Sequence, residues 1–516
     1  MGVYSMAMHQ IIERKSDKAD VLLLLEGTFP YVLGGVSVWV ANLIQKMPEV
    51  TFAGVFLGGA EEMYPKGIQF TLPDNLVHFE SHFLFDAEKD ISSNKEFKVK
   101  KKGIGEHLEF IHDGFSSLRK NVPGNKCPVF GNNKEIDEIL FNSQFLLKSK
   151  NSWDFILKKY NELSSEPSFI DYFWTVRNIH EPFSVLYKVL RSIPEVKLIH
   201  SPSTGYAGML GALIHQYRGT PFITTEHGIY TRERYLELLD TSLFKLPAVI
   251  DRIDNNYSYL QMMWMNLFES FSRMSYANSN YVTSLYDAAR SIQIASGSKP
   301  EKTRVIPNGI NISRFKIDLE SKKASAGESK VVALVGRLVR IKSTVDFITA
   351  MSVVSQKCDH VEGWVCYAGA EEQEYIDECM QLAEHLNLGE KLKFIENKAM
   401  VELLPQIDVL VLSSISEAMP LTVLEAFAGG VPVVCSNVGS CSELIFGRGE
   451  EDIAIGPAGI IVPPSQVDKL AEGIIKLTTD SSLYAACSEA GLKRVKKYYD
   501  EDMMVDAYYA LYKEFL

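Results

Sequence analysis

The segment VLVLSSISEAMPLTVLEAFAGGVPVVCS, residues 409–436, contains the pattern on which the expected fold depends. Its two ends, VLVLSS and VPVVCS, are short apolar runs typical of strands buried on both faces of a parallel sheet. Between them lies a helix-length stretch that begins near Pro420 and ends at Gly429-Gly430. Because strands that alternate with helices form a parallel sheet covered on both faces, this segment predicts a doubly wound α/β domain.

The same alternation extends in both directions from this segment. After about residue 319 we expect further strands at Val331–Gly336, Gly363–Gly369, Leu392–Ile395 and Gly459–Val462. An earlier series predicts strands at VLLLLEG after Asp20, TFAGVFLG from Thr51, Lys197–His200, Pro221–Gly228, Arg273–Ser279 and Arg304–Gly309, with helices from Gly34-Gly35 to Met47 and over Tyr206–Tyr217. The sequence therefore predicts two Rossmann-like domains.

Length and composition agree with two domains. A chain of 516 residues exceeds what one core usually holds. We expect an N-terminal domain over residues 1–318, with a largely helical elaboration at about 61–192 that includes helices near Glu135–Lys148 and Trp153–Leu163. A polar linker is expected over Phe315–Ser329, followed by a C-terminal domain over 319–496. The apolar helix at 497–516 is expected to cross back to the first domain.

Charge and cysteine usage exclude some classes of function. The formal net charge of −12 disfavours a general nucleic-acid binder, and the basic run at residues 98–102 is interpreted as solvated surface. The seven scattered cysteines form no C-x-x-C pair and are interpreted as reduced thiols. No apolar stretch reaches the length of a membrane span or a leader segment, so we expect a cytoplasmic protein.

Basic and acidic side chains follow the predicted strands of the second domain. Arg337 and Lys342 come just after the strand that ends at Gly336, and they can neutralise a nucleotide diphosphate. Glu417 lies in a loop after another strand, and Glu425 follows eight residues later on the next helix. The two glutamates can then bind sugar and ribose hydroxyls. Exposure or pairing with the helix dipole is the structural alternative for each of these residues.

The start of that helix is a candidate phosphate site. Residues Met419, Pro420, Leu421 and Thr422 surround the expected N-terminus, where proline is favoured and where backbone N–H groups are free to bind an anion.

The first domain offers two further candidates. Gly34 and Gly35 open a helix directly after the first strand, although a βα turn uses glycine for geometry as often as for a ligand. His227, in the motif TTEHG, lies at the end of a predicted strand, and an isolated histidine there is more often a satisfied core residue. Glu226, Arg232 and Arg234 are neighbours with a possible acceptor role.

Together, E-x7-E, GR-x4-K and the GGV after the first strand resemble family 4 glycosyltransferases of the GT-B fold, whose two domains face each other across a cleft. EGTFPYVLGGVSVWV, TTEHGIYTRER, IPNGI and DEDMMVDAYYALY resemble, more narrowly, the PelF-type enzymes of Pel exopolysaccharide synthesis. The resemblance implies a retaining transferase that uses UDP-glucose and works with a membrane-bound synthase complex. It assigns the diphosphate to Arg337 and Lys342, the ribose to Glu425 and the transferred sugar to Glu417. It places Gly35 beside the donor phosphates and His227 near the reacting sugar.

Some residues depart from the family pattern. Cys441 and Glu443 replace part of a glycine-rich stretch, and Arg340 stands where a proline is common. The sequence DED at residues 500–502 resembles a metal-binding DxD, but its place before a helix favours a capping role. We expect no metal cofactor. A UDP-sugar 2-epimerase and a non-catalytic UDP-sugar-binding subunit remain the alternatives, and Gly369 and Ile395–Asn397 are candidates for uracil contacts.

Overall fold

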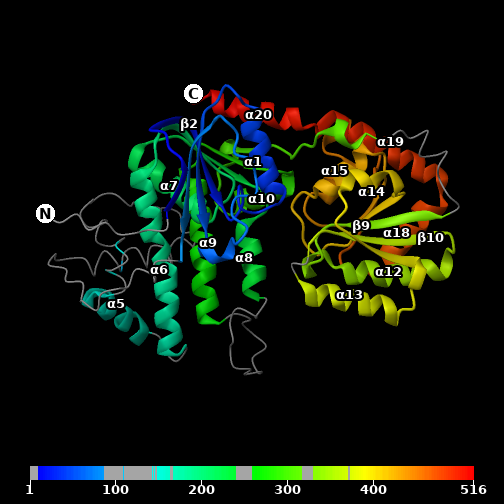
Figure 1. The fold of residues 1–516 in the computed structure, drawn as a ribbon, viewed down its shortest axis with the longest axis horizontal. Helices are drawn as coiled ribbons and strands as arrows, with labels where there is room; N and C mark the ends of the chain where they lie inside the picture. The colour runs from blue at the N-terminus through cyan, green and yellow to red at the C-terminus, as the bar shows by residue number, and fades with distance from the viewer. Residues whose placement is uncertain are drawn as a thin grey trace. The chain divides into compact units, whose positions relative to one another are not determined.

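The computed structural model describes residues 10–85, 109, 142, 145, 148–162, 167–239, 258–316, 329–369 and 372–516. The chain divides into two compact units, which are described separately (Figure 1). The first contains Met1–Ser284, Arg290–Arg304 and Tyr509–Leu516, and the second contains Leu285–Ala289 and Val305–Tyr508. Most of the expected helix at Glu135–Lys148, the basic run at 98–102 and most of the linker at Phe315–Ser329 lie outside the described residues.

The first unit contains an eight-stranded sheet with the order β1-β4-β3-β2-β5-β6-β7-β8. Strand β1 is antiparallel to β4, whereas the pairs from β4 through β7 are parallel. The strands are β1 (Gln10–Arg14), β2 (Lys18–Glu26), β3 (Phe52–Gly58), β4 (Leu76–Phe83), β5 (Glu195–Ser201), β6 (Phe222–Glu226), β7 (Tyr281–Ser284) and β8 (Thr303–Val305). Because the strand order reverses beside β2, the topological switch point lies between β2 and β5.

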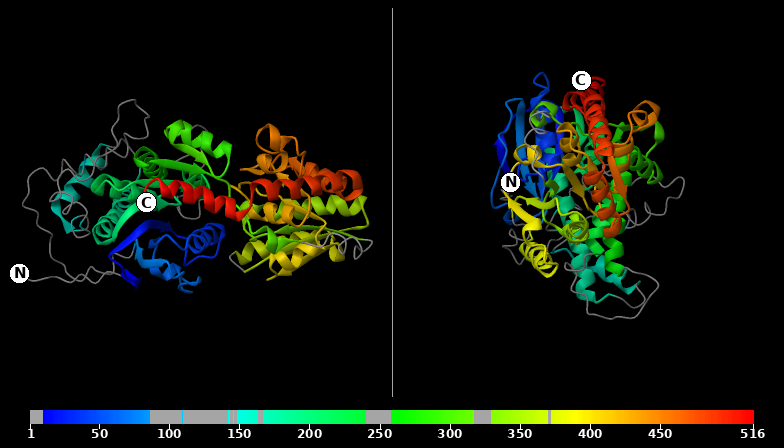
Figure 2. Two further views of the ribbon diagram at one scale, coloured as in Figure 1. Left: turned by 90° about the horizontal axis from the view of Figure 1, so that it is seen from above. Right: turned by 90° about the vertical axis from the view of Figure 1, so that its right-hand side faces the viewer.

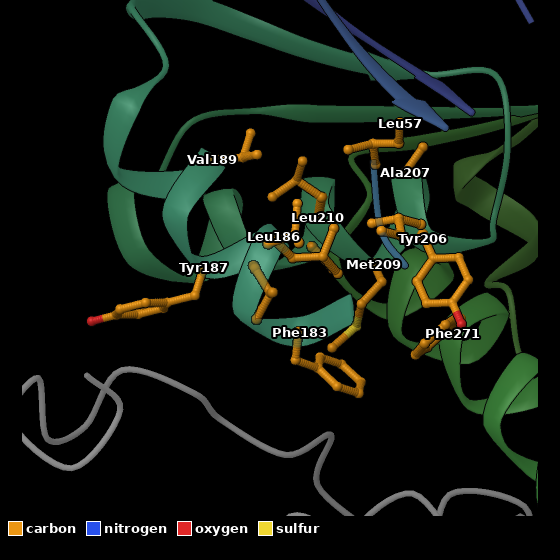
Figure 3. Packing of buried hydrophobic residues seen from close by; sticks show 14 of the residues in the cluster. Leu57, Phe183, Leu186, Tyr187, Val189, Tyr206, Ala207, Met209, Leu210 and Phe271 are labelled. Carbon is orange, nitrogen blue, oxygen red and sulfur yellow. The ribbon is translucent and has the colours of Figure 1, made fainter. Parts of the chain in front are cut away.

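Helices separate these strands along the chain. They are α1 (Gly35–Gln45), α5 (Lys150–Asn161), α6 (Phe169–Ser192), α7 (Tyr206–Arg218), α8 (Tyr230–Leu239), α9 (Tyr259–Asn278) and α10 (Asp287–Ala295). Figure 3 shows the core between α6 and α7, where Leu186 lies beside Met209 and Leu210. These side chains are buried, so the packing of α7 against β2, β5 and α9 fixes where its N-terminus meets the sheet edge.

The second unit contains a six-stranded parallel sheet with the order β11-β10-β9-β12-β13-β14. The strands are β9 (Lys330–Val335), β10 (Val361–Tyr367), β11 (Leu392–Glu396), β12 (Val409–Leu412), β13 (Val433–Ser436) and β14 (Gly459–Val462). Strands β12 and β13 are buried along their whole length, as expected for a sheet covered on both faces. The switch point lies between β9 and β12, directly before the loops that carry Arg337 and Glu417.

Helices lie on both sides of this second sheet (Figure 1). Helices α12 (Thr344–Lys357), α13 (Gln373–His385) and α18 (Val467–Thr479) share one hydrophobic core with the sheet. The remaining helices are α14 (Met400–Leu403), α15 (Leu421–Ala428), α16 (Cys441–Phe446), α17 (Gly449–Ile453), α19 (Ser481–Tyr498) and α20 (Glu501–Lys513). Arg494 of α19 is fully buried and binds the Asp452 carboxylate at 2.7 Å and four backbone carbonyls, which attaches α19 to the α16–α17 segment.

The C-terminal helix belongs to both units. Figure 2 shows α19 and α20 as consecutive helices, drawn in red. Residues up to Tyr508 group with the second unit, and Tyr509–Leu516 group with the first. The chain therefore returns to the first unit at its C-terminus, as the sequence predicts. Within the described ranges, no helix is both long enough and apolar enough to cross a bilayer.

Two features of the first unit correct the sequence analysis. Residues 273–279, expected as a strand, instead form the last turns of α9, and the strand β7 begins at Tyr281. Within the elaboration expected to be largely helical, Leu76–Phe83 forms β4, which pairs with β1. Apolar residues recur at helical spacing along α9 from well before residue 273. Residues 273–279 taken alone are too few to show this helical period.

Candidate functional site

The loop after β9 is fixed to the loop after β12. Ser413 Oγ donates to the carbonyl oxygens of Lys342 and Ser343 at 3.0 and 2.9 Å, and Ile415 N–H donates to the carbonyl of Ile341 at 2.9 Å. Ser343 adopts left-handed angles, φ 48° and ψ 52°, which cost free energy for a residue other than glycine. The bonds from Ser413 offset this strain and hold the backbone that carries Lys342.

Lys342 and Glu417 meet at this junction. Lys342 Nζ lies 2.6 Å from Glu417 Oε1, and Ser414 Oγ donates to the same oxygen at 2.6 Å. The Glu417 side chain is 11% exposed and that of Lys342 is 24% exposed, so the ion pair is partly shielded from water. The second carboxylate oxygen, Oε2, makes no hydrogen bond to a residue in the described part of the chain. Arg337 lies exposed at the start of the same loop.

A glycine allows a second backbone segment to support Glu417. Gly439 has φ +54°, and a Cβ there would lie 2.2 Å from the carbonyl oxygen of Glu417 and 2.3 Å from that of Ala418. Ser440 N–H donates to the Ala418 carbonyl at 2.8 Å. Only glycine fits so close an approach, so this loop fixes the backbone next to Glu417.

Helix α15 begins beside this cluster without a side-chain cap. Pro420 is the N-cap residue and the helix begins at Leu421, so Pro420 precedes the helix rather than opening it. The N–H groups of Leu421 and Thr422 lie in the first turn, where helix N–H groups lack helical partners. Met419 is buried, and its Sδ accepts the N–H of Asn308 at 3.3 Å. The helix start provides N–H groups suited to an anion, while the Met419 side chain packs inward.

Glu425 lies on the second turn of α15. Burial raises the pKa of the Glu425 carboxyl to about 7, and the charge of Arg314 opposes this shift. No residue in the described ranges hydrogen-bonds the carboxylate. Near neutral pH the group is therefore poised between its protonated and charged forms, and a donor such as a hydroxyl would stabilise the charged form.

Glu425→Gln is expected to make the stability of the ligand-free protein less sensitive to alkaline pH. Because the pKa of Glu425 is raised from 4.5 to about 7 in the folded state, its contribution is fully present below pH 4.5 and is lost as pH rises through 7. When pH rises from 5 to 8.5, the free energy of unfolding of the variant should increase relative to that of the natural protein by on the order of 1–3 kcal/mol. Urea unfolding at both pH values measures this difference. Glu402→Gln, at an exposed position, is the control, and an equal difference at both pH values would contradict the assignment.

The expected uracil candidates also meet. Gly369 N–H donates to Asn397 Oδ1 at 3.4 Å, and Asn397 N–H donates to the Tyr367 carbonyl at 2.8 Å. The ends of β10 and β11 therefore lie side by side, with Asn397 in a left-handed conformation.

In the first unit, Gly34 and Gly35 form the start of α1. Gly34 is the N-cap residue, its backbone is extended, and no side chain caps the helix. The first turn contains no acidic residue, and a Cβ built on Gly34 would meet no atom within 4 Å. This helix start is thus open, and its N–H groups favour an anion.

His227 follows β6 and packs against α1. Its ring lies 4.7 Å from that of Trp39 in an edge arrangement, and its Nε2 is buried without a hydrogen-bond partner. Burial lowers the pKa of His227 to about 4, so the imidazole is neutral at pH 7. The residue remains partly exposed, which suits a group that meets a ligand.

The neighbours of His227 have different roles. Glu226 is buried and accepts hydrogen bonds from Thr204, Tyr276 and Gln293 at 2.8, 2.6 and 3.0 Å, so its carboxylate stabilises the fold and does not reach an acceptor. Arg234 is paired with Glu237, and Arg232 is exposed.

The lowered pKa values of His200 and His227 predict acid sensitivity. The pKa of His227 is lowered to about 4 and that of His200 to about 3, so the stability they contribute is present above pH 6.5 and is lost as pH falls below it. His227→Gln is expected to reduce the slope of unfolding free energy between pH 5.5 and 4.5 by up to about 1.4 kcal/mol per pH unit. The exposed His385→Gln should leave the slope unchanged. An unaltered slope in the His227 variant would show that the ring is not buried as described.

The departures from the family pattern have structural explanations. Arg340 pairs with Glu378 at 2.9 Å and stacks on Tyr375. Glu443 accepts the N–H groups of Asp287 and Ala288 at the start of α10, and Cys441 is buried. Asp500 Oδ1 accepts the N–H of Asp502 at 2.9 Å, which is a local cap before α20. Across the described ranges, no group of three or more His, Cys, Asp or Glu side chains has metal-binding geometry.

The sequence analysis did not identify the residues that position Lys342 and Glu417. Ser413 and Ser414 directly follow β12, and their place after a strand at the switch point could have indicated this role. Trp39 gave no such signal, because its contact with His227 joins residues far apart in the chain.

Two family matches span most of the chain. Residues 19–301 match the family described as Domain of unknown function (DUF3492), and residues 316–494 match Glycosyl transferases group 1. The chain therefore belongs to the DUF3492 family, and residues 316–494 of its second unit are similar to group 1 glycosyltransferases.

Individual relatives agree with this class. The chain is 29% identical over 216 residues to an uncharacterized glycosyltransferase of Methanocaldococcus jannaschii, covering 38% of this chain and 53% of the relative. It is 27% identical over 286 residues to the lipopolysaccharide core biosynthesis mannosyltransferase LpsB of Rhizobium meliloti, covering 52% of this chain and 77% of that protein. The chain thus spans about half the length of the first of these relatives.

Solved structures share the fold. Anabaena HepE in complex with UDP has a TM-score of 0.58 at 15% identity, covering 96% of this chain and 100% of that chain. Sucrose-phosphate synthase from Thermosynechococcus elongatus has a TM-score of 0.56 at 15% identity, covering 96% and 98%. At this identity the likeness concerns the fold alone. The prediction of a GT-B protein is confirmed, and the narrower resemblance to PelF-type enzymes stays a prediction.

Proposed function

We propose that this protein is a retaining glycosyltransferase that transfers a hexose from a UDP-sugar, first of all UDP-glucose, to a growing glycan. The observation that carries the proposal is the junction of Lys342, Glu417 and Ser414 beside the uncapped start of α15. A cation, a carboxylate with one oxygen available and free helix N–H groups converge there at a switch point. This is the chemistry that a sugar diphosphate requires.

The proposed roles follow from the positions of the side chains. Lys342 and Arg337 stabilise the charge that develops on the departing diphosphate, together with the N–H groups of Leu421 and Thr422. Glu425 binds the ribose hydroxyls. Glu417 orients the transferred sugar and stabilises positive charge at C1. Because these groups already supply positive charge at the diphosphate, we propose that the reaction needs no metal ion.

The proposed reaction exchanges the bond at C1 and moves one proton. An acceptor hydroxyl attacks C1 on the face from which the diphosphate leaves, and the bond between C1 and the phosphate oxygen breaks. A leaving phosphate oxygen takes the hydroxyl proton, and His227 lies near the acceptor. The anomeric configuration is therefore kept, which NMR of the product tests directly.

The biological setting is proposed on resemblance. The motifs similar to PelF-type enzymes suggest Pel-type exopolysaccharide as the product, a membrane-bound synthase complex as partner and a cytoplasmic location. Named relatives support glycan synthesis in general, since LpsB is a lipopolysaccharide core mannosyltransferase. HepE was solved with UDP and with UDP-glucose, which supports testing UDP-glucose first.

The experiment that tests this function is a donor panel. The purified protein is incubated with UDP-glucose, UDP-galactose, their two N-acetylamino counterparts and GDP-mannose in the presence of EDTA, and released nucleoside diphosphate is measured. Release of UDP from one donor is the expected result. Binding of UDP without release from any donor would favour a non-catalytic subunit. Interconversion of UDP-N-acetylhexosamines without an acceptor would identify an epimerase.

A further inference from the structure

A buried chain of hydrogen bonds connects the C-terminal helix to the middle of the first sheet. His200 lies on β5 and is fully buried. Its Nδ1 is 2.6 Å from Tyr512 Oη on α20, and its Nε2 is 2.7 Å from Thr225 Oγ1 on β6. Thr225 Oγ1 is in turn 2.6 Å from Thr283 Oγ1 on β7. Both ring nitrogens are satisfied, so the orientation of the His200 ring is fixed by residues on separate elements.

Trp39 packs against both His200 and His227. The centroid of the Trp39 ring lies 5.7 Å from that of the His200 ring and 4.7 Å from that of the His227 ring, and both pairs are in T-shaped arrangements. Trp39 is buried and lies on α1, one turn after the open helix start at Gly34 and Gly35. Since Nε2 of His227 has no hydrogen-bond partner, packing against Trp39 is the contact that orients this ring.

We propose that Tyr512 and His200 are positioning residues, which set the ring orientation of Trp39 and, through it, of His227. The proposal rests on the proposed function, in which His227 lies near the reacting acceptor. Tyr512 belongs to the C-terminal segment Tyr509–Leu516, which groups with the first unit. In the proposal, this segment helps to orient His227, the residue placed near the acceptor. Tyr512 itself touches neither donor nor acceptor in this account.

Tyr512→Phe removes the hydroxyl and keeps the ring that packs against Phe52 and His200. It leaves a buried ring nitrogen of His200 without its tyrosine partner, so one of the two hydrogen bonds that orient the ring is lost. We expect kcat to fall about tenfold, because small misplacements at a reacting centre have effects of this size. The KM for the UDP-sugar and the Kd for UDP should change less than twofold, since Arg337, Lys342 and Glu425, to which UDP is assigned, lie in the second unit.

The matched control is Tyr281→Phe. Tyr281 Oη donates to Glu514 at 2.7 Å, so this variant removes a hydrogen bond to the same C-terminal segment at an exposed position. It should leave kcat unchanged.

A second readout is the ¹⁵N-histidine NMR spectrum, with the His227 signal identified by its absence from the spectrum of His227→Gln. Tyr512→Phe should shift that signal, and Tyr281→Phe should not.

The two readouts separate the failure of this inference from the failure of the proposed function. If the natural protein releases UDP from no donor, the function fails, while the NMR comparison still decides the positioning role. Full kcat and an unshifted His227 signal in a folded Tyr512→Phe protein would overturn the inference, as would a loss of thermal stability alone. If Tyr512→Phe does not fold, Thr225→Val removes the other partner of His200 and must give the same fall in kcat and the same shift.

Discussion

Glu417→Gln is expected to lower kcat by about 10²–10³-fold and to leave the Kd for UDP within about threefold. Glutamine has nearly the same shape but no charge, so it does not stabilise positive charge at C1 of the sugar. In the ligand-free protein Glu417 Oε1 accepts from Lys342 and Ser414, and the amide oxygen can keep these contacts. The side chain is positioned by the loops of Ser413 and Gly439, so the substitution changes charge rather than geometry.

The measurement pairs single-turnover UDP release with calorimetric UDP binding. Glu402→Gln replaces an exposed glutamate of the same unit and should retain full activity. Full transfer by Glu417→Gln would show that the carboxylate has no electrostatic role. Loss of UDP binding in parallel with transfer would show instead that the substitution damages the donor site.

Lys342→Met is expected to weaken UDP binding by about 10²-fold and to lower kcat as well. A lysine that binds a diphosphate contributes charge-assisted hydrogen bonds, which are among the strong ones, and the same charge stabilises the leaving group. Methionine keeps an unbranched apolar side chain of similar length. The substitution also leaves the partly buried Glu417 without its cation, 2.6 Å away in the natural protein.

Calorimetry of UDP binding and steady-state kinetics measure the two effects separately. Lys496→Met, at an exposed position on α19, should bind UDP as the natural protein does. Unchanged UDP affinity in Lys342→Met would mean that Lys342 serves only its ion pair with Glu417. The double variant Glu417→Gln/Lys342→Met then tests coupling, because residues in one ion pair are expected to act non-additively.

The second unit could be predicted closely from the sequence. Strands β12 and β13 are short apolar runs bounded by glycine or polar residues, and burial along their whole length makes this pattern clear. The proximity of Lys342 and Glu417 could be predicted for the same reason. Parallel strands end at one edge of the sheet, so residues that follow β9 and β12 meet there whatever the details of the loops.

The first unit was harder to predict because its contacts are less local. Strand β1 is the edge strand of the sheet and pairs antiparallel with β4. Neither strand shows a strong alternation of apolar and polar residues. From the sequence, Glu226 was a plausible contact for the acceptor substrate. The structure shows that its carboxylate is buried and bonded to residues of α9 and α10. The link from Tyr512 to His200 and Trp39 joins distant segments, and no short motif contains it.

A crystal structure with UDP bound is the most decisive test of the proposed donor site. We expect the diphosphate between Lys342, Arg337 and the N–H groups of Leu421 and Thr422, with the ribose hydroxyls on the Glu425 carboxylate. We also expect Lys342 to move from Glu417 toward the phosphates. A diphosphate bound elsewhere, or one that leaves the ion pair of Lys342 and Glu417 intact, would contradict it.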